Sequence, residues 1–232
     1  MTDNTKGILY AATTASLWGF LAIALKIAVT DLSPVTVVWF RFTTAFIILA
    51  LLTLAFRRSD FTIFIRPPVA LFFAAIFLGF NYLGFISGIN YVSPSSSQVF
   101  IMVGPVTFAL AGIVIFKEHV NWKHITGFIV VILGILLFYT EQIEALAETD
   151  HNFTKGMLLI FGGGLSWTVF ASLQKKLVKT YTPNQLNLFI YSFCSLGFLA
   201  FAQMEKLPDL SGNEWILLLF LGANTVIAYG SL

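Results

Sequence analysis

Charged residues are scarce in this chain of 232 residues. Lys, Arg, Asp and Glu together make up 10% of it, whereas 58% of the residues are hydrophobic and the mean hydropathy is +0.88. A soluble domain carries roughly 25% charged residues, so too few are present to cover a surface that faces water. The apolar content also excludes intrinsic disorder, which requires low hydrophobicity. The remaining class is an integral membrane protein.

The chain also has little cysteine, a small net charge and few acidic residues within its apolar runs. The single cysteine, Cys194, excludes a disulfide scaffold. A net charge of +2 is too small for a nucleic-acid-binding module, so no nucleic-acid partner is expected. The three histidines, His119, His124 and His151, fall in loops or at interfaces, and we expect neither a metal nor another cofactor.

Long apolar runs dominate what is present. A helix needs about 20 mostly apolar residues to cross the roughly 30 Å hydrocarbon core. Eight runs approach that length, at Gly7–Val29, Thr36–Phe56, Val69–Gly88, Ser95–Phe116, Trp122–Tyr139, Gly156–Leu173, Leu186–Ala202 and Trp215–Leu232. None alternates apolar and polar residues as the strands of a membrane barrel do. The sequence therefore predicts an all-α integral membrane protein.

The basic residues between the runs are distributed unevenly. Those on one side are Lys6, Arg57, Arg58, Arg66, Lys117, Lys123, Lys175, Lys176 and Lys179, whereas the other side has Lys155 and Lys206. Because basic loops stay in the cytoplasm, we expect the N-terminus to be cytoplasmic in a multi-pass protein of the inner (plasma) membrane.

An internal repeat relates the two parts of the chain. Residues 18–26 (WGFLAIALK) match residues 167–175 (WTVFASLQK) at an offset of 149, which also pairs Pro34 with Pro183. A second echo, at an offset of 143, pairs LGFN ending at Asn81 with LGAN ending at Asn224. The second copy starts five runs after the first, and this odd step reverses the second copy in the membrane. The sequence therefore predicts an inverted-topology repeat, an arrangement that recurs in secondary transporters.

The repeat also predicts how the chain divides. We expect the first repeat, with five transmembrane helices, at residues 1–140 and an incomplete second repeat, with three, at residues 154–232. The second copy ends where the first is at about residue 89, so we expect eight helices to be present of a total of ten.

Several short motifs follow one another along the chain: Leu17-Trp18-Gly19, Ser33-Pro34 with Phe40-Arg41-Phe42, Val92-Ser93-Pro94-Ser95, Gly104-Pro105-Val106, and Phe116-Lys117-Glu118 followed by Gly127. In this order and spacing they resemble the motifs of the drug/metabolite transporter superfamily, specifically the EamA-type permeases. The resemblance implies ten helices in two inverted five-helix repeats and transport, often efflux, of small metabolites such as amino acids.

Arg41 is the most informative residue for function. It lies seven positions beyond Pro34, which places it roughly 10 Å into the membrane at about 1.5 Å per residue. A buried arginine costs at least about 2.5–3.5 kcal/mol near the bilayer centre, so it needs a partner, water or a substrate. The alternatives are a guanidinium that faces a cavity and one that bonds helix carbonyls or snorkels outward.

Other polar and aromatic residues within the runs complete the predicted substrate site. Lys26 either adds positive charge to the outer half of the cavity or snorkels to the interface. Amides and aromatic rings either orient a substrate or serve helix packing. Together the predicted substrate-binding residues are Arg41, Trp18, Lys26, Asn81, Tyr82, Gln98, Trp167 and Asn224. Pro105 removes a backbone hydrogen bond and is expected to kink its helix and to serve in gating.

The leading interpretation is a secondary transporter, most simply an exporter, of small metabolites by alternating access. Its expected partners are the metabolite, the lipid bilayer and either protons or an exchanged substrate. No Asp or Glu lies well inside a run, so a carboxylate proton relay has no candidate. An enzyme is not expected, because no nucleophile–base pair, metal cluster or carboxylate pair is visible. A non-transporting membrane subunit or small-molecule sensor is the alternative.

Overall fold

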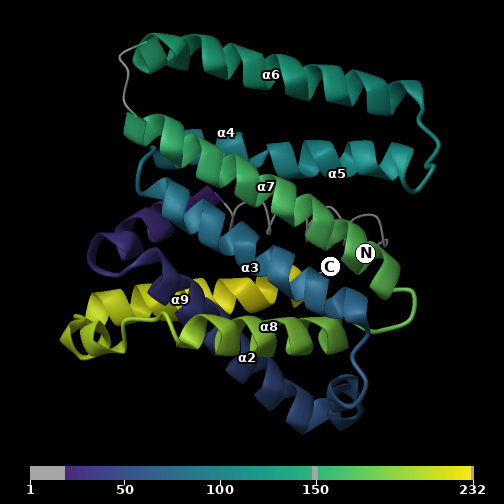
Figure 1. Cartoon of the computed structure of the whole chain (residues 1–232), viewed down its shortest axis with the longest axis vertical. Helices are drawn as coiled ribbons and strands as arrows, with labels where there is room; N and C mark the ends of the chain where they lie inside the picture. The colour runs from purple at the N-terminus through teal and green to yellow at the C-terminus, as the bar shows by residue number, and fades with distance from the viewer. Residues whose placement is uncertain (1–18, 148–150, 231–232) are drawn as a thin grey trace, which may run out of the picture.

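The computed structural model describes residues 19–147 and 151–230, and every regular element in these ranges is a helix (Figure 1). Residues 19–31 are helical. They are followed by α2 (Pro34–Phe56), η1 (Arg58–Phe64), α3 (Val69–Ile89), α4 (Pro94–Ile101), α5 (Val103–Val114), α6 (Trp122–Ala147), α7 (His151–Leu177), α8 (Pro183–Leu199), η2 (Met204–Asp209) and α9 (Gly212–Gly230).

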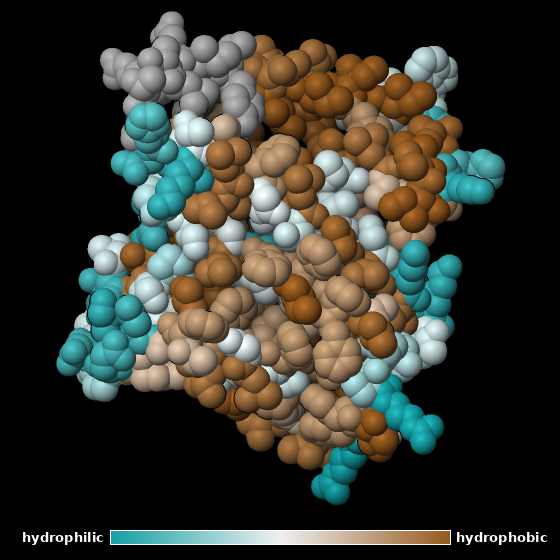
Figure 2. Space-filling view, viewed as in Figure 1, coloured by the Kyte–Doolittle hydropathy of each residue, from teal (hydrophilic) through white to brown (hydrophobic). Residues whose placement is uncertain are grey.

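The helices have the length and composition of membrane spans. Pro34–Phe56, Val69–Ile89, Pro94–Val114 and His151–Leu177 are each long and apolar enough to cross a bilayer, and shorter apolar helices cover Ile125–Phe138 and Gly212–Ile227. In the face shown in Figure 2, hydrophilic residues gather along two opposite edges and apolar residues fill the space between them. The prediction of an all-α, multi-pass membrane fold is confirmed.

Some helix ends differ from the predicted runs because a helix can continue beyond the hydrocarbon layer. The run expected to end at Tyr139 continues as helix to Ala147, and the run expected to start at Gly156 starts at His151. Polar residues continue both helices, and their backbone hydrogen bonds are made within the helix whether the surroundings are lipid or water.

Three helices start at a Ser-Pro or Thr-Pro pair. The hydroxyls of Ser33, Ser93 and Thr182 accept hydrogen bonds from backbone N–H groups at the starts of α2, α4 and α8. The proline that follows each cap has no N–H to leave unsatisfied and a φ suited to the first helical turn. The Pro34/Pro183 match therefore marks the same feature twice, the start of α2 and the start of α8.

The fourth predicted run is divided into two helices at Met102. Residue 102 is a turn between α4, which ends at Ile101, and α5, which starts at Val103. Pro105 has no N–H to donate to the carbonyl of Ile101, four residues before it. The observed break lies where the missing hydrogen bond would have been, as the sequence predicts for Pro105.

Helices α2 and α8 run in opposite directions side by side. The N–H of Gln203, just after α8, donates to the hydroxyl of Thr36 at the start of α2, at 2.9 Å. At the opposite end, the amide of Asn184 in α8 donates to Asp60 in η1, at 3.3 Å. The segments matched at an offset of 149 are thus antiparallel, as an inverted repeat requires.

The helices next to this pair are also related by the repeat. Helix α3 packs on α8 and α9 packs on α2. Gly79 allows the first contact, because a Cβ there would lie 3.3 Å from the ring of Phe198, and Gly222 allows the second, because a Cβ there would lie 2.6 Å from Thr44. Gly79 and Gly222 belong to the LGFN and LGAN echoes, so these short sequences mark equivalent helix contacts.

Helices α3 and α7 approach each other closely at glycines. A Cβ on Gly84 of α3 would lie 2.7 Å from the carbonyl oxygen of Leu159 and 3.2 Å from the Cα of Gly163 on α7. A Cβ on Gly88 would lie 2.7 Å from the carbonyl oxygen of Gly156. Small residues at such contacts let backbones pack closely where no hydrophobic effect drives helices together.

This contact yields a test of packing. We expect Gly84→Ala to lower the free energy of unfolding by about 1–3 kcal/mol, the usual cost of overpacking, because a backbone carbonyl cannot move aside. In Gly134→Ala, on α6, the added methyl group meets no described atom within 4 Å, so this control should be neutral or slightly stabilising. Thermal unfolding in detergent measures both, and equal stability of the two variants would contradict the close contact.

Candidate functional site

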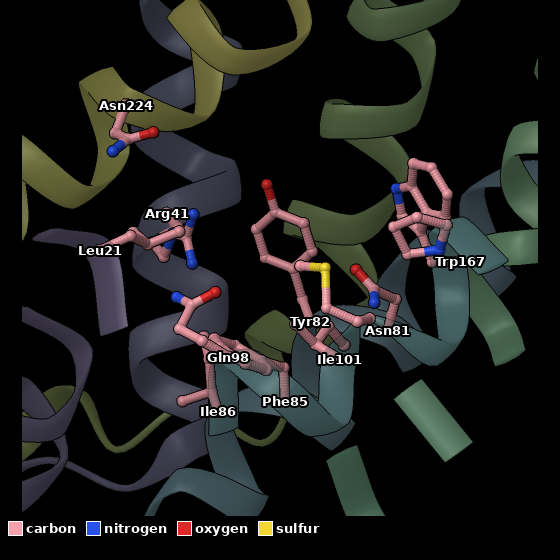
Figure 3. A pocket seen from close by; sticks show the side chains of 12 residues that line it. Leu21, Arg41, Asn81, Tyr82, Phe85, Ile86, Gln98, Ile101, Trp167 and Asn224 are labelled. Atoms are coloured by element: carbon pink, nitrogen blue, oxygen red, sulfur yellow. The ribbon is translucent and has the colours of Figure 1, made fainter. Parts of the chain in front are cut away.

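A cavity of about 90 Å³ lies among α2, α3, α4, α5, α7 and α9. Its lining residues are Leu21, Arg41, Asn81, Tyr82, Phe85, Ile86, Gln98, Ile101, Met102, Pro105, Trp167 and Asn224. Figure 3 shows Arg41, Gln98 and Asn224 at one side of the cavity and Trp167 at the other, with Tyr82 and Asn81 between them. One water needs at least about 10–15 Å³, so the space suits several waters or part of a small solute.

Arg41 is buried, with 4% of its surface exposed, and does not snorkel to the membrane face. Its Nε donates to the hydroxyl of Thr225 on α9 at 3.2 Å. Its guanidinium carbon lies 4.5 Å from the ring centroid of Tyr82 on α3, a cation–π distance. The structure thus brings Arg41 of α2 together with residues of α3 and α9 at the wall of the cavity.

Asn224 lines the cavity, and packing provides no partner for its amide among the described residues. Its side chain is 2% exposed, and neither the nitrogen nor the oxygen of its amide has a hydrogen-bond partner among the described residues. A buried amide without partners costs about 1–3 kcal/mol per unsatisfied group. Such groups call for an explanation, because buried polar atoms in proteins are nearly always paired.

Asn81, the repeat partner of Asn224, also lines the cavity but is partly satisfied. Its amide nitrogen donates to the carbonyl of Gly163 on α7 at 2.9 Å. The two asparagines of the LGFN and LGAN echoes therefore face one space from α3 and α9. Sequence reasoning predicted both residues, and the fold brings them together.

Aromatic residues shape the rest of the cavity. Tyr82 lies against Phe42, with ring centroids 4.6 Å apart, and Trp167 packs edge-on against Phe108 of α5 at 5.7 Å. A Cβ on Gly104 would lie 3.3 Å from the Trp167 ring, so this glycine lets the indole approach α5. These contacts place the rings of Tyr82 and Trp167 at the wall of the cavity.

Two predicted site residues are not placed in the cavity. Lys26 does not line it, because its ammonium donates to the carbonyls of Ile89, Asn90 and Val92, at 2.6, 3.0 and 3.2 Å. A lysine near a helix C-terminus satisfies carbonyls that lack a partner within the helix. This contact corrects the expectation of a cavity charge in favour of a structural role at the end of α3. Trp18 lies outside the described residues.

Some lining residues were not predicted from the sequence. Leu21, Phe85, Ile86, Ile101 and Met102 line the cavity but are ordinary apolar residues within apolar runs, and no local signal separates them from core residues. Thr225, the hydrogen-bond partner of Arg41, was also missed. Thr225 directly follows Asn224. A second polar residue at this point of an apolar run is the sequence signal for the α9 wall of the cavity.

The described residues contain no group of three or more His, Cys, Asp or Glu that can hold a metal. The site therefore consists of one buried cation, amides with capacity to bond and aromatic walls, inside an all-α membrane fold. This combination is typical of proteins that bind small polar molecules between transmembrane helices.

Comparison with known proteins places the chain in a family. The model of the EamA-like transporter family matches residues 5–140 and 154–232, and the chain belongs to this family. It is 30% identical to an uncharacterized transporter of Haemophilus influenzae, over 97% of this chain and 74% of that protein. It is 29% identical to the uncharacterized inner membrane transporter YhbE of Escherichia coli K12, over 97% of this chain and 71% of YhbE.

A solved crystal structure has the same fold. It matches with a TM-score of 0.70 at 17% sequence identity, over 98% of this chain and 77% of that one. The family and the fold together identify a multi-pass membrane transporter with a small-molecule substrate.

The contacts of Lys26 give a test of its role. We expect Lys26→Met to lower the free energy of unfolding by about 1–3 kcal/mol, because it leaves helix-end carbonyls without a partner. The affinity for a transported solute should stay within about twofold of the wild type, since 1.4 kcal/mol corresponds to tenfold and no cavity contact is lost. Thermal unfolding and equilibrium binding measure the two effects. A large loss of affinity at unchanged stability would show instead that Lys26 takes part in substrate binding.

Proposed function

We propose that the protein is a secondary carrier of small metabolites with a carboxylate group, amino acids among them, and that the Arg41 cavity is its substrate site. The observation that carries this proposal is the buried amide of Asn224, which has no partner among the described residues although it lines the same cavity as Arg41. A carboxylate accepts hydrogen bonds from both a guanidinium and an amide nitrogen.

The charge of the cavity supports a substrate with one singly charged anionic group placed at Arg41. Arg41 is its one basic lining residue, and no Asp or Glu lines it among the described residues. A carboxylate carries a single negative charge and can bond a guanidinium through two parallel hydrogen bonds. A phosphate monoester carries about −1.5 to −2 at pH 7 and would leave charge uncompensated beside a single arginine.

The repeats supply a mechanism. Residues 1–140 and 154–232 form the two inverted repeats, with the N-terminus in the cytoplasm, and α2 and α8 cross the membrane in opposite directions between them. Rocking of one repeat against the other opens the cavity to each side in turn. The break between α4 and α5 at Met102 gives this motion a bend close to the substrate. Export, driven by exchange or by protons, is the direction that we propose.

The role of Arg41 is tested by transport. We expect Arg41→Ala to lower saturable counterflow of a carboxylate substrate in proteoliposomes by roughly a hundredfold or more, because removing one partner of a buried ion pair costs 3–5 kcal/mol. Arg58→Ala is the matched control, since Arg58 is exposed and donates to the carbonyl of Leu54 outside the cavity. Unchanged kinetics in Arg41→Ala would remove Arg41 from the site. Binding without counterflow in the wild type would favour a sensor or non-transporting subunit.

A substitution of Asn224 is expected to change stability and substrate binding in opposite directions. Leucine has nearly the shape of asparagine and no hydrogen-bonding atoms, so Asn224→Leu removes two unsatisfied buried atoms. We expect this variant to be more stable than the wild type by about 1–3 kcal/mol and to bind substrate at least about tenfold more weakly. Thermal unfolding and equilibrium binding measure this pair of effects. A less stable variant would show that the amide serves packing and that the cavity has another purpose.

A further inference from the structure

The hydroxyl of Thr225 meets Arg41 as an acceptor. Thr225 is fully buried on α9 and does not line the cavity. Its hydroxyl donates to the carbonyl of Leu221, one turn earlier in the same helix, at 3.0 Å. A hydroxyl has a single proton, so the side of this oxygen that faces Arg41 presents a lone pair, which accepts from Nε at 3.2 Å. The bond to Leu221 therefore fixes the orientation in which Thr225 receives the guanidinium.

A second buried residue holds the backbone of Thr225. The phenolic hydroxyl of Tyr191, on α8, donates to the carbonyl oxygen of Thr225 at 3.1 Å. Tyr191 is almost entirely buried and, like Thr225, does not line the cavity. Its ring centroid lies 6.1 Å from that of Phe42, the residue after Arg41. Hydrogen bonds therefore connect α8 to α9, and α9 to the arginine on α2.

Two residues that contact Arg41 occupy equivalent positions in the repeats. The offset of the LGFN and LGAN echoes, 143, also pairs Tyr82 with Thr225. The ring centroid of Tyr82 lies 4.5 Å from the guanidinium carbon, and Thr225 bonds Nε. The offset of 149 pairs Arg41 with Ile190, which is buried and apolar. One arginine thus receives a contact from each repeat, and the position equivalent to its own carries no charge.

The two contacts together determine how the guanidinium is oriented. A ring packed against the guanidinium limits its tilt, and a hydrogen bond at Nε limits its rotation within the guanidinium plane. Orientation matters because the N–H groups of arginine form a rigid planar fork, which binds a carboxylate through two parallel hydrogen bonds. A binding group needs such supporting contacts to be held in a productive geometry.

We infer that Thr225 and Tyr191 are positioning residues of the substrate site: Tyr191 holds Thr225, and Thr225 orients the guanidinium of Arg41 toward the carboxylate. Neither residue lines the cavity, so each acts through the arginine and not by touching the substrate. The pair therefore sets the preference of the carrier for a carboxylate over a neutral group of the same shape. This inference rests on the proposed function, since it takes Arg41 as the carboxylate site.

The test compares two probes that differ in one group. Alanine carries a carboxylate and alaninamide a neutral amide of nearly the same shape, and their dissociation constants are measured on the full chain in lipid nanodiscs. We expect the wild type to prefer alanine. Thr225→Val removes the acceptor and should lower this preference by at least about tenfold, because a hydrogen bond to a charged group is lost. Thr225→Ser keeps the hydroxyl and should hold the preference within about twofold of the wild type.

A double variant tests whether Tyr191 acts through Thr225. Tyr191→Phe removes only a hydroxyl, and the equivalent position in the first repeat, at the offset of 149, is already Phe42. We expect this variant to lower the preference for alanine by about threefold, an effect in the range of one neutral hydrogen bond. Added to Thr225→Val, the same substitution should have no further effect. Effects that multiply in the double variant would show that Tyr191 acts independently and would overturn its positioning role.

Thr53→Val is the matched control. Thr53 is as fully buried as Thr225, but it lies outside the cavity and its hydroxyl has no hydrogen-bond partner among the described residues. We expect this variant to keep the wild-type preference for alanine. Thermal unfolding shows which variants fold. If Thr225→Val does not fold, Tyr191→Phe decides, and an unchanged preference in that variant would overturn the inference.

The outcomes separate this inference from the proposed function. A wild type that binds alanine and alaninamide equally would overturn the proposed carboxylate site. A preference for alanine that Thr225→Val and Tyr191→Phe leave unchanged would overturn the positioning role and leave the Arg41 site intact. Loss of affinity for both probes by the same factor would also overturn the positioning role, because orientation of the guanidinium matters to the carboxylate and not to the neutral amide.

Discussion

The structure depends on an arginine buried within the membrane-spanning part of the chain. Arg41 stays in the interior because three helices supply what water would otherwise give it: α2 carries it, Thr225 of α9 accepts its hydrogen bond, and Tyr82 of α3 lies under its guanidinium. A buried cation needs such partners, because moving a charge out of water is costly unless it is paired and hydrogen-bonded. The same three helices contribute Arg41, Tyr82 and Asn224 to the wall of the cavity, so the contacts that bury the charge also shape part of the cavity.

The repeat explains why this cavity lies where it does. Equivalent short sequences place Asn81 on α3 and Asn224 on α9, and equivalent glycines let α3 approach α8 and α9 approach α2. Equivalence of sequence does not make the two asparagines alike, however. Asn81 bonds to Gly163, whereas Asn224 has no partner among the described residues. The amide without a described partner therefore lies on the α9 side of the cavity, which Arg41 also lines.

The fold and part of the candidate site could be predicted from the sequence, because polar residues are conspicuous in segments that are apolar enough to cross a lipid bilayer. Polar residues such as Arg41, Asn81 and Gln98 stand out in apolar runs, and Ser-Pro and Thr-Pro pairs mark helix starts. The role of Lys26 could not be predicted, because its partners are carbonyls more than 60 residues away that only the fold brings near. Apolar lining residues such as Met102 also could not be identified from the sequence, since an apolar residue beside a cavity and one in the core have the same sequence pattern.

The central claim is that Arg41 and Asn224 hold the carboxylate of a small solute. The most direct measurement is a crystal structure with a bromine-substituted amino acid bound, in which the anomalous signal of bromine locates the side chain and difference density locates the carboxylate. We expect carboxylate density within hydrogen-bond distance of both Arg41 and Asn224. Density for the solute elsewhere, with the amide of Asn224 bonded to protein groups alone, would contradict it.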